Sequence, residues 1–187
     1  MSMFDALYDY VPFNEQEKRD KKELTRWLSV GGDQVYTRES LTAHMTASAW
    51  VVSPDRQYVL MAYHNLYNSW AWLGGHADGD TDLHAVARRE AEEETGIAGL
   101  RDASDGVFSI EILTVDGHEK RGEYVSSHLH LNVTYLFEAD MDGKLTVRPD
   151  ENSAVGWIRV DELEKKVSEP WMMKRVYAKL MEKSRSC

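Results

Sequence analysis

The segment from Gly75 to Ile97 reads GHADGDTDLHAVARREAEEETGI, and it joins a glycine-rich acidic loop to a helix that is dense in glutamates. A helix advances about 100° per residue, so Glu90, Glu93 and Glu94 fall within roughly one third of its circumference. Like charges three or four residues apart on a helix repel each other. A divalent cation bound by the carboxylate oxygens would turn this repulsion into attraction. The triplet therefore indicates either a solvated acidic surface, which is common, or a metal site.

The full spacing of this segment resembles the Nudix box, in which a glycine precedes the pattern Arg-Glu-apolar-x-Glu-Glu-x-Gly-apolar. Agreement over so many specified positions is far more specific than a lone glycine motif. The matching residues are Gly75, Arg89, Glu90, Ala91, Glu93, Glu94, Gly96 and Ile97.

One box position departs from the family pattern, because Thr81 stands where the family has its first glutamate. In the family, that glutamate supports the loop and pairs with the box arginine, here Arg89. Either Asp80 or Asp82 takes over this role, or Thr81 simply caps the helix. The departure concerns the loop and leaves the metal-binding glutamates intact.

Length and composition indicate one globular unit with a packed core, because the chain has 187 residues, 42% hydrophobic residues and six tryptophans. Without a membrane-spanning apolar run or a signal peptide, and with Cys187 as its single cysteine, the chain is expected in the reducing cytoplasm. A net charge of −10 disfavours nucleic-acid binding. It does not exclude a phosphorylated small molecule, since a bound metal inverts the local field.

Hydrophobic periodicity predicts helices at both ends of the chain and strands on both sides of the box helix. Residues 1–40 read as one or two amphipathic helices that stop at Gly31-Gly32. The expected strands are Ala43–Val52, Tyr58–His64, Gly106–Val115, His128–Glu138 and Ala154–Val160, and the other expected helices are Asp82–Thr95, Asp161–Val167 and Trp171–Ser184.

This order of elements predicts an α/β fold with a mixed sheet between helices, which is the Nudix α/β/α sandwich. Residues 41–187 would form the Nudix hydrolase domain, and residues 1–40 a helical extension. Two roles are open for the extension: it forms the surface of a homodimer, or it covers the substrate cleft.

The resemblance implies a Mg²⁺ or Mn²⁺ site. Glu90 and Glu94 are expected as the principal ligands, Glu93 as a third or water-mediated ligand, and the carbonyl of Gly75 as an additional ligand. A glycine suits that position because its backbone approaches an ion closely. Arg89 is expected to orient the glutamates.

The general base is left open by the sequence. Related Nudix enzymes take it either from the box glutamates, here Glu90 and Glu93, or from an acidic residue on a later loop. Glu151 occupies such a loop position, with an ordinary solvated acid as the alternative, and Glu123 and Glu138 are weaker candidates.

Histidines and tryptophans near the box are candidates for substrate binding. His128 and His130 alternate along one strand, so their side chains point the same way and could contact a phosphate or a metal; the alternative is a pair of partly buried strand residues. His76 follows the diglycine and is either a substrate contact or an ordinary loop residue. Trp70 and Trp72 either stack on a nucleobase or pack in the core.

The resemblance to the Nudix family implies metal-dependent hydrolysis of the pyrophosphate linkage in a nucleoside diphosphate derivative or a similar diphosphate-containing metabolite. The side motifs of several substrate classes are absent, so the leaving group stays open. One alternative is a nucleotide sensor without activity. Another is an isopentenyl-diphosphate isomerase-like enzyme, which the lack of an internal cysteine disfavours.

Overall fold

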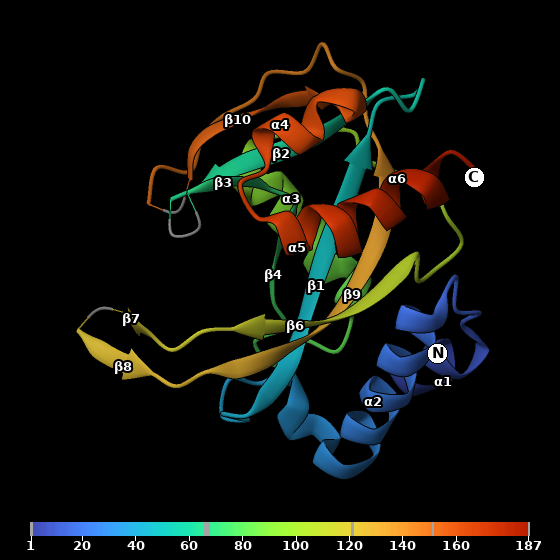
Figure 1. Ribbon diagram of the computed structural model, residues 1–187, viewed down its shortest axis with the longest axis vertical. Coiled ribbons are helices and arrows are strands. Elements are labelled where there is room, and N and C mark those ends of the chain that lie inside the picture. Colours follow the sequence, from blue (N-terminus) through green and yellow to red (C-terminus); the bar gives the residue numbers. More distant parts are fainter. Residues whose placement is uncertain (1, 66–67, 121, 151, 187) are drawn as a thin grey trace.

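The computed structural model describes residues 2–65, 68–120, 122–150 and 152–186. Its strands are β1 (Ala43–Val52), β2 (Tyr58–His64), β3 (Ser69–Ala71), β4 (Leu73–His76), β5 (Arg101–Asp102), β6 (Ser109–Val115), β7 (His118–Lys120), β8 (Glu123–Val125), β9 (His128–Glu138) and β10 (Asn152–Arg159). In the described residues, eight strands form one sheet, whose central order is β10-β2-β1-β9-β5. In addition, β3 pairs with β2, β4 with β1 and β6 with β9, while β7 and β8 form a separate hairpin (Figure 1).

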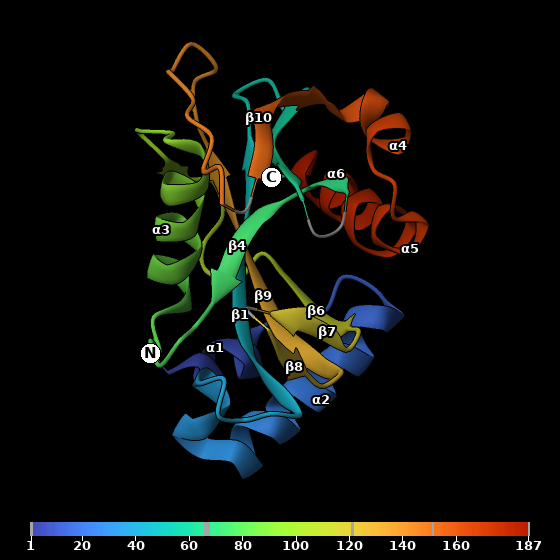
Figure 2. The same ribbon diagram turned by 90° about the vertical axis from the view of Figure 1, so that its left-hand side faces the viewer.

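Helices cover both faces of this sheet. They are α1 (Met3–Asp9), α2 (Glu15–Gly31), α3 (Leu83–Thr95), α4 (Leu163–Lys166), α5 (Pro170–Met172) and α6 (Ala178–Ser184). The box helix α3 lies on one face, whereas α4, α5 and α6 lie on the other (Figure 2). The expected α/β sandwich is therefore confirmed. Within the described residues, no helix combines the length and the apolar character that crossing a membrane requires.

The central strand β1 is buried along its whole length. It pairs in parallel with β9, from Ala43 opposite Leu129 to Val52 opposite Glu138, whereas the neighbouring pairs β1–β2 and β1–β4 are antiparallel. Successive side chains of a strand point to opposite faces of a sheet. Met45 and its odd-numbered neighbours accordingly pack in one cluster with the apolar side of α3. Trp50, on the other face, stacks on Tyr177 with ring centroids 5.7 Å apart.

Several predicted boundaries are confirmed, and one strand begins later than expected. The strands Ala43–Val52, Tyr58–His64 and His128–Glu138 have the predicted limits. The predicted strand Gly106–Val115 begins only at Ser109. Gly106 has a φ of 77°, a left-handed conformation that an extended strand does not contain.

The last third of the chain differs from the prediction in detail. The strand expected over Ala154–Val160 spans Asn152–Arg159 and has an irregular register near its start. The helix expected over Asp161–Val167 divides into a 3₁₀ turn, Val160–Glu162, and α4. The helix expected over Trp171–Ser184 begins at Pro170, since proline is well suited to the first turn of a helix. It contains a π-helical segment, Met173–Tyr177, between α5 and α6.

The N-terminal extension packs into the same core as the sheet. Leu7 of α1 and Leu24 of α2 are fully buried in the cluster that contains β1 and α3. Helix α2 ends at Gly31, as expected, and a 3₁₀ turn, Gly32–Tyr36, leads into the sheet. The extension therefore shares its hydrophobic core with the sheet.

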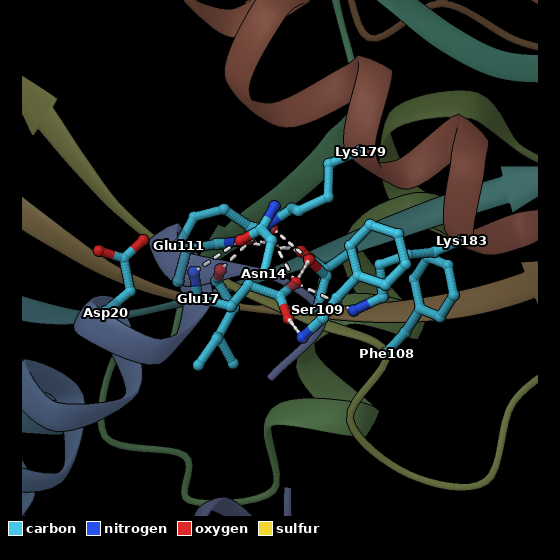
Figure 3. Close-up of polar contacts among 12 residues, drawn as sticks. Asn14, Glu17, Asp20, Phe108, Ser109, Glu111, Lys179 and Lys183 are labelled. Carbon is cyan, nitrogen blue, oxygen red and sulfur yellow. Dashed lines mark hydrogen bonds and ion pairs between the residues drawn. The ribbon is translucent and has the colours of Figure 1, made fainter. Parts of the chain in front are cut away.

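A buried polar network connects α2, β6 and α6 (Figure 3). The Glu17 carboxylate, which is 0% exposed, lies 3.1 Å from the Lys179 ammonium and 2.9 Å from the Lys183 ammonium. Lys179 also pairs with Glu111 at 2.9 Å, and Ser109 donates a hydrogen bond to Glu17. Since a buried charge is costly unless it is paired, these contacts hold the extension against the C-terminal helix.

The charge state of Glu17 follows from these partners. Burial by itself would raise the pKa of the Glu17 carboxyl. The Lys179 ammonium, together with a hydrogen bond from the Tyr10 hydroxyl and the charge of Lys183, outweighs burial and lowers this pKa to about 2. Glu17 therefore stays ionised inside the protein.

Candidate active site

The box helix is positioned by a cap at each end. The Asp82 side chain accepts a hydrogen bond from the Ala85 N–H at 3.0 Å, which satisfies one of the free amides at the helix start. At the other end Gly96 adopts the left-handed conformation, with φ 67°, that commonly ends a helix. Both caps lie within the box, so this local sequence determines the limits of α3.

The Glu90 carboxylate lies directly against the backbone of Gly75. A Cβ atom placed on Gly75 would be 2.6 Å from Cδ of Glu90 and 2.7 Å from Oε2. A side chain at position 75 would have to displace the Glu90 carboxylate, so glycine at this position allows the close contact between β4 and the Glu90 side chain. The structure thus brings together two of the predicted metal ligands.

The other two box glutamates differ in their surroundings. Glu94, one turn after Glu90, is only 7% exposed. The Glu93 side chain is about half exposed, at 49%, and its carboxylate lies 3.4 Å from the Arg148 guanidinium. Arg148 is a cation beside the box that the sequence analysis did not identify, because it follows Glu93 by 55 residues and belongs to no motif.

The structure resolves the roles in the atypical loop. Asp80 pairs with Arg89 at 3.3 Å, so it supplies the partner that the family takes from its first box glutamate. Asp82 caps the helix, and Thr81 is exposed. Of the three alternatives, the Asp80 pairing is confirmed and the Thr81 cap is wrong, because the neighbouring Asp82 fills the cap position.

The same loop is tied to the N-terminal part of the chain. Arg38 donates two hydrogen bonds of 2.6 Å to the Asp78 carboxylate. The Gly79 N–H donates to the carbonyl of Tyr36 at 2.8 Å. The segment before β1 therefore holds the loop that leads into the box helix.

Trp70 and Trp72 lie on the face of the sheet opposite α3. Trp70 makes an edge contact with Tyr63 at 5.7 Å, and Trp72 makes one with Tyr177 at 5.8 Å. The Trp72 N–H also donates to the Tyr177 hydroxyl at 3.3 Å. Both tryptophans pack against the cluster under α5 and α6, which agrees with the packing alternative.

Four histidines gather on that same face, and we call them the histidine cluster: His44, His76, His128 and His130. His44 lies beside His130 in the parallel pairing of β1 and β9, and His76 comes from β4. Ligand nitrogens of His44, His76 and His130 lie within 4.8 Å of one another. The Nε2 atoms of His128 and His130 are 3.3 Å apart, which confirms that the two side chains point the same way. His44 was not among the predicted site residues, since a single histidine in an apolar strand carries no motif.

Burial and mutual contact favour the neutral form of two members of the cluster, His44 and His130. Burial, followed by the neighbouring imidazoles of His76 and His44, lowers the pKa of His130 to about 2. Burial also lowers the pKa of His44, although a hydrogen bond to the Ser40 carbonyl opposes the shift. Neutral imidazole is the form of histidine that binds metals.

The candidates for a general base beyond the box differ in position. Glu151 lies outside the described residues. Glu138, at the end of β9, pairs with Arg56 and Arg101 at 3.0 Å each, which is a structural role. Glu123 is an exposed residue of the β7–β8 hairpin.

The two groups of candidate ligands differ in their donor atoms. The box offers carboxylate oxygens from Glu90, Glu93 and Glu94 and the backbone carbonyl of Gly75, a set that suits hard cations such as Mg²⁺ and Mn²⁺. The histidine cluster offers imidazole nitrogens, which suit transition metals. The box therefore fits the metal that the resemblance implies.

Comparisons with known proteins agree with this geometry. A model of the NUDIX domain matches residues 42–180, and no curated protein matches the chain. A C. elegans Ap4A hydrolase binary complex has a TM-score of 0.55 and 18% identity, covering 76% of this chain and 95% of that chain. A Nudix hydrolase from M. Smegmatis, RenU, has a TM-score of 0.56 and 16% identity, covering 76% and 86%.

The E. coli dihydroneopterin triphosphate pyrophosphohydrolase is similar as well, with a TM-score of 0.54 and 14% identity over 74% of this chain and 94% of that chain. At such identities the structures establish a shared fold, whereas the family model covers most of the sequence and includes the box. The chain belongs to the Nudix hydrolase family.

Proposed function

We propose that this Nudix hydrolase requires Mg²⁺ or Mn²⁺ and cleaves the pyrophosphate linkage of a nucleoside diphosphate derivative or a similar diphosphate-containing metabolite. The observation that carries the proposal is the contact between the Glu90 carboxylate and Gly75, with Glu94 one turn further along α3. It places a carboxylate of α3 directly beside the backbone of β4.

Glu90 and Glu94 would hold the ion, and the Gly75 carbonyl and Glu93 would complete the protein ligands. When bound, such an ion acts as a Lewis acid on a phosphoryl oxygen and lowers the pKa of a bound water. The chain contributes the positions of the donors. Gly75 has no side chain to separate them, and burial restricts the motion of Glu94.

Arg89 acts as a positioning residue. Its ion pair with Asp80 joins the loop to the helix that carries the glutamates, so the loop and the ligands keep their relative placement. Glu93 and Glu151 are the two candidates for the base that takes the proton of the attacking water. The Arg148 guanidinium beside Glu93 is suited to a phosphate oxygen, because guanidinium groups bind phosphates with two parallel hydrogen bonds.

A substrate screen tests the reaction. Nucleoside diphosphate derivatives and nucleoside triphosphates are incubated with the protein and Mg²⁺ or Mn²⁺, and phosphate is measured after a coupled phosphatase. Turnover that a chelator abolishes supports the proposal. Tight binding of one compound without turnover of any would contradict it and indicate a sensor. Isomerisation of isopentenyl diphosphate without phosphate release would indicate the isomerase alternative.

A matched pair of variants tests the location of the site. Glu94→Gln removes one expected ligand charge and should lower kcat/KM by about 100-fold or more, the usual scale for losing an electrostatic group in an active site. Glu92→Gln changes an exposed glutamate of the same helix and should leave kcat/KM near the wild-type value. Full activity of Glu94→Gln would show that the metal site has been misplaced.

A further inference from the structure

The histidine cluster lies on the opposite side of the sheet from the box helix. In the pairing of β1 with β4, Gly75 is opposite Ala47, and His76 is opposite Thr46. Ala47 packs in the cluster that contains α3, and Gly75 faces Glu90. Because side chains alternate along a strand, His76, Thr46 and His44 face the other way. The cluster is thus separate from the glutamate site, although it shares β4 with it.

Hydrogen bonds orient the imidazole rings of the cluster. Nδ1 of His44 lies 3.1 Å from the carbonyl oxygen of Ser40, and Nδ1 of His128 lies 2.8 Å from that of Ser126. A carbonyl oxygen only accepts, so each Nδ1 carries the proton and, in the neutral ring, each Nε2 has the lone pair. Histidine ligands of metals are usually held in this way, with the second nitrogen bonded to a carbonyl or another acceptor.

The same reasoning extends to His130. Since Nε2 of His128 accepts, Nε2 of His130 is the donor in their 3.3 Å contact. The lone pair of His130 is then on Nδ1. His128 in this arrangement orients His130, and the Ser126 carbonyl orients His128 in turn.

One nitrogen of the cluster is buried without a protein partner. His44 is 5% exposed, and its Nε2 has no hydrogen bond. A buried polar atom that lacks a partner costs free energy, and such atoms are rare in folded proteins. A metal ion would satisfy this lone pair.

We propose that His44, His76 and His130 bind a first-row transition-metal ion, such as Zn²⁺, at a site distinct from the glutamates of the box. Imidazole nitrogens without carboxylates select such ions over Mg²⁺. Ligand atoms within 4.8 Å of one another need only small shifts, because nitrogens at about 2.0–2.1 Å from a tetrahedral zinc lie about 3.3 Å apart. A bound ion would join β1, β4 and β9 and hold β4, which carries Gly75. This inference does not rest on the proposed reaction.

The charges beside the site are compatible with a cation. Arg38 lies near the histidines, and its ion pair with Asp78, with two hydrogen bonds of 2.6 Å, offsets its charge. His76 and His130 are partly exposed, so an ion can reach the site from solvent.

Cobalt provides the test, because nitrogen-ligated Co²⁺ in a tetrahedral site absorbs visible light. The protein carrying Glu94→Gln is stripped with a chelator and titrated with Co²⁺, so that the box contributes little. One equivalent of Co²⁺ should give the visible absorption bands of a tetrahedral site. Added Zn²⁺ should displace the Co²⁺ and raise the Tm of the protein above that of the metal-free form. His44→Ala in this background should weaken binding by at least about tenfold. His84→Ala, which removes a histidine outside the cluster, should bind as the parent does.

A second measurement, on the wild-type protein, requires neither enzymatic activity nor a folded variant. Zinc should shift the imidazole NMR signals of His44, His76 and His130 in the wild-type protein and leave those of His84 unchanged. Absence of these shifts, or an unchanged Co²⁺ titration in folded His44→Ala protein, would overturn the proposal. The proposal of Mg²⁺-dependent hydrolysis would be unaffected, because the substrate screen tests it separately.

Discussion

The two faces of the sheet carry their candidate ligands in different ways. On the α3 face, the oxygen donors Gly75, Glu90 and Glu94 come from one continuous segment of the sequence. On the other face, the nitrogen donors come from three strands, and the contact of His44 with His130 depends on the pairing of β1 with β9. The polar groups there continue into the buried network, because Asn132 bonds both Thr46 and Glu111 at 2.9 Å.

The difference shows how a helix and a sheet bring ligands together. A helix places residues three and four apart side by side, so the box site is largely specified by short-range spacing. A sheet places residues side by side only through register, which depends on many distant contacts. The box face should therefore be sensitive to local geometry, and the histidine face to the long-range contacts that hold the sheet and its helices together.

The largest effect is expected from Glu17→Gln, which breaks the buried network. Removing one partner leaves the Lys179 and Lys183 ammonium groups incompletely paired, so we expect a loss of about 3–5 kcal/mol in the free energy of unfolding at pH 7. Urea denaturation measures it. Glu15→Gln, an exposed residue of the same helix, should change stability by less than about 1 kcal/mol.

The pH dependence gives this prediction a second signature. The folded-state pKa of Glu17 is lowered to about 2, whereas the ordinary pKa of a glutamate is 4.5. The carboxylate therefore contributes fully to the free energy of unfolding above pH 4.5, and this contribution is lost as the pH falls towards 2. The stability difference between wild type and Glu17→Gln should therefore shrink over this window. A difference that stays constant from pH 7 to pH 2 would show that the charge of Glu17 is not what stabilises the network.

An intermediate effect is expected from Gly75→Ala on the box face. The added Cβ would lie 2.6 Å from Cδ of Glu90 and must displace the carboxylate. Displacements of about 1 Å near a reacting centre cost on the order of 100-fold in rate, so kcat should fall by about this factor with the fold retained. Steady-state kinetics and circular dichroism measure the two properties.

The control for this variant is Gly143→Ala, whose Cβ would make only ordinary contacts, the nearest at 3.6 Å from Ile97. It should keep wild-type kinetics. If Gly75→Ala is also fully active, the close approach of β4 and α3 is not required for catalysis, and the box face is less dependent on local geometry than we infer.

The smallest effect is expected from Thr81→Glu, which restores the family residue. Asp80 already pairs with Arg89, and the side chains of this pair are 40% and 44% exposed. An added exposed charge should change stability by less than about 1 kcal/mol and leave activity within a few-fold of wild type. A large gain in activity would mean that Asp80 replaces the family glutamate poorly, and that the loop limits the enzyme.

Much of the fold could be predicted because its elements are marked by local signals. The helix over the box has its caps, Asp82 and Gly96, in the sequence itself, and the long strands alternate clearly enough to show their limits. The short strands β3, β4 and β5 were not predicted, since two to four residues carry no periodic pattern.

The sequence by itself determined the family, the α/β architecture and the oxygen-rich helix of the candidate active site, because each depends on residues that are close in the chain. Only the tertiary structure decided that Asp80 replaces the missing glutamate, that Arg148 lies beside Glu93, and that His44 joins the other histidines. Such contacts depend on strand register and on the paths of the loops. Both are determined by the packing of the whole chain, so the spacing of neighbouring residues in the sequence does not predict them.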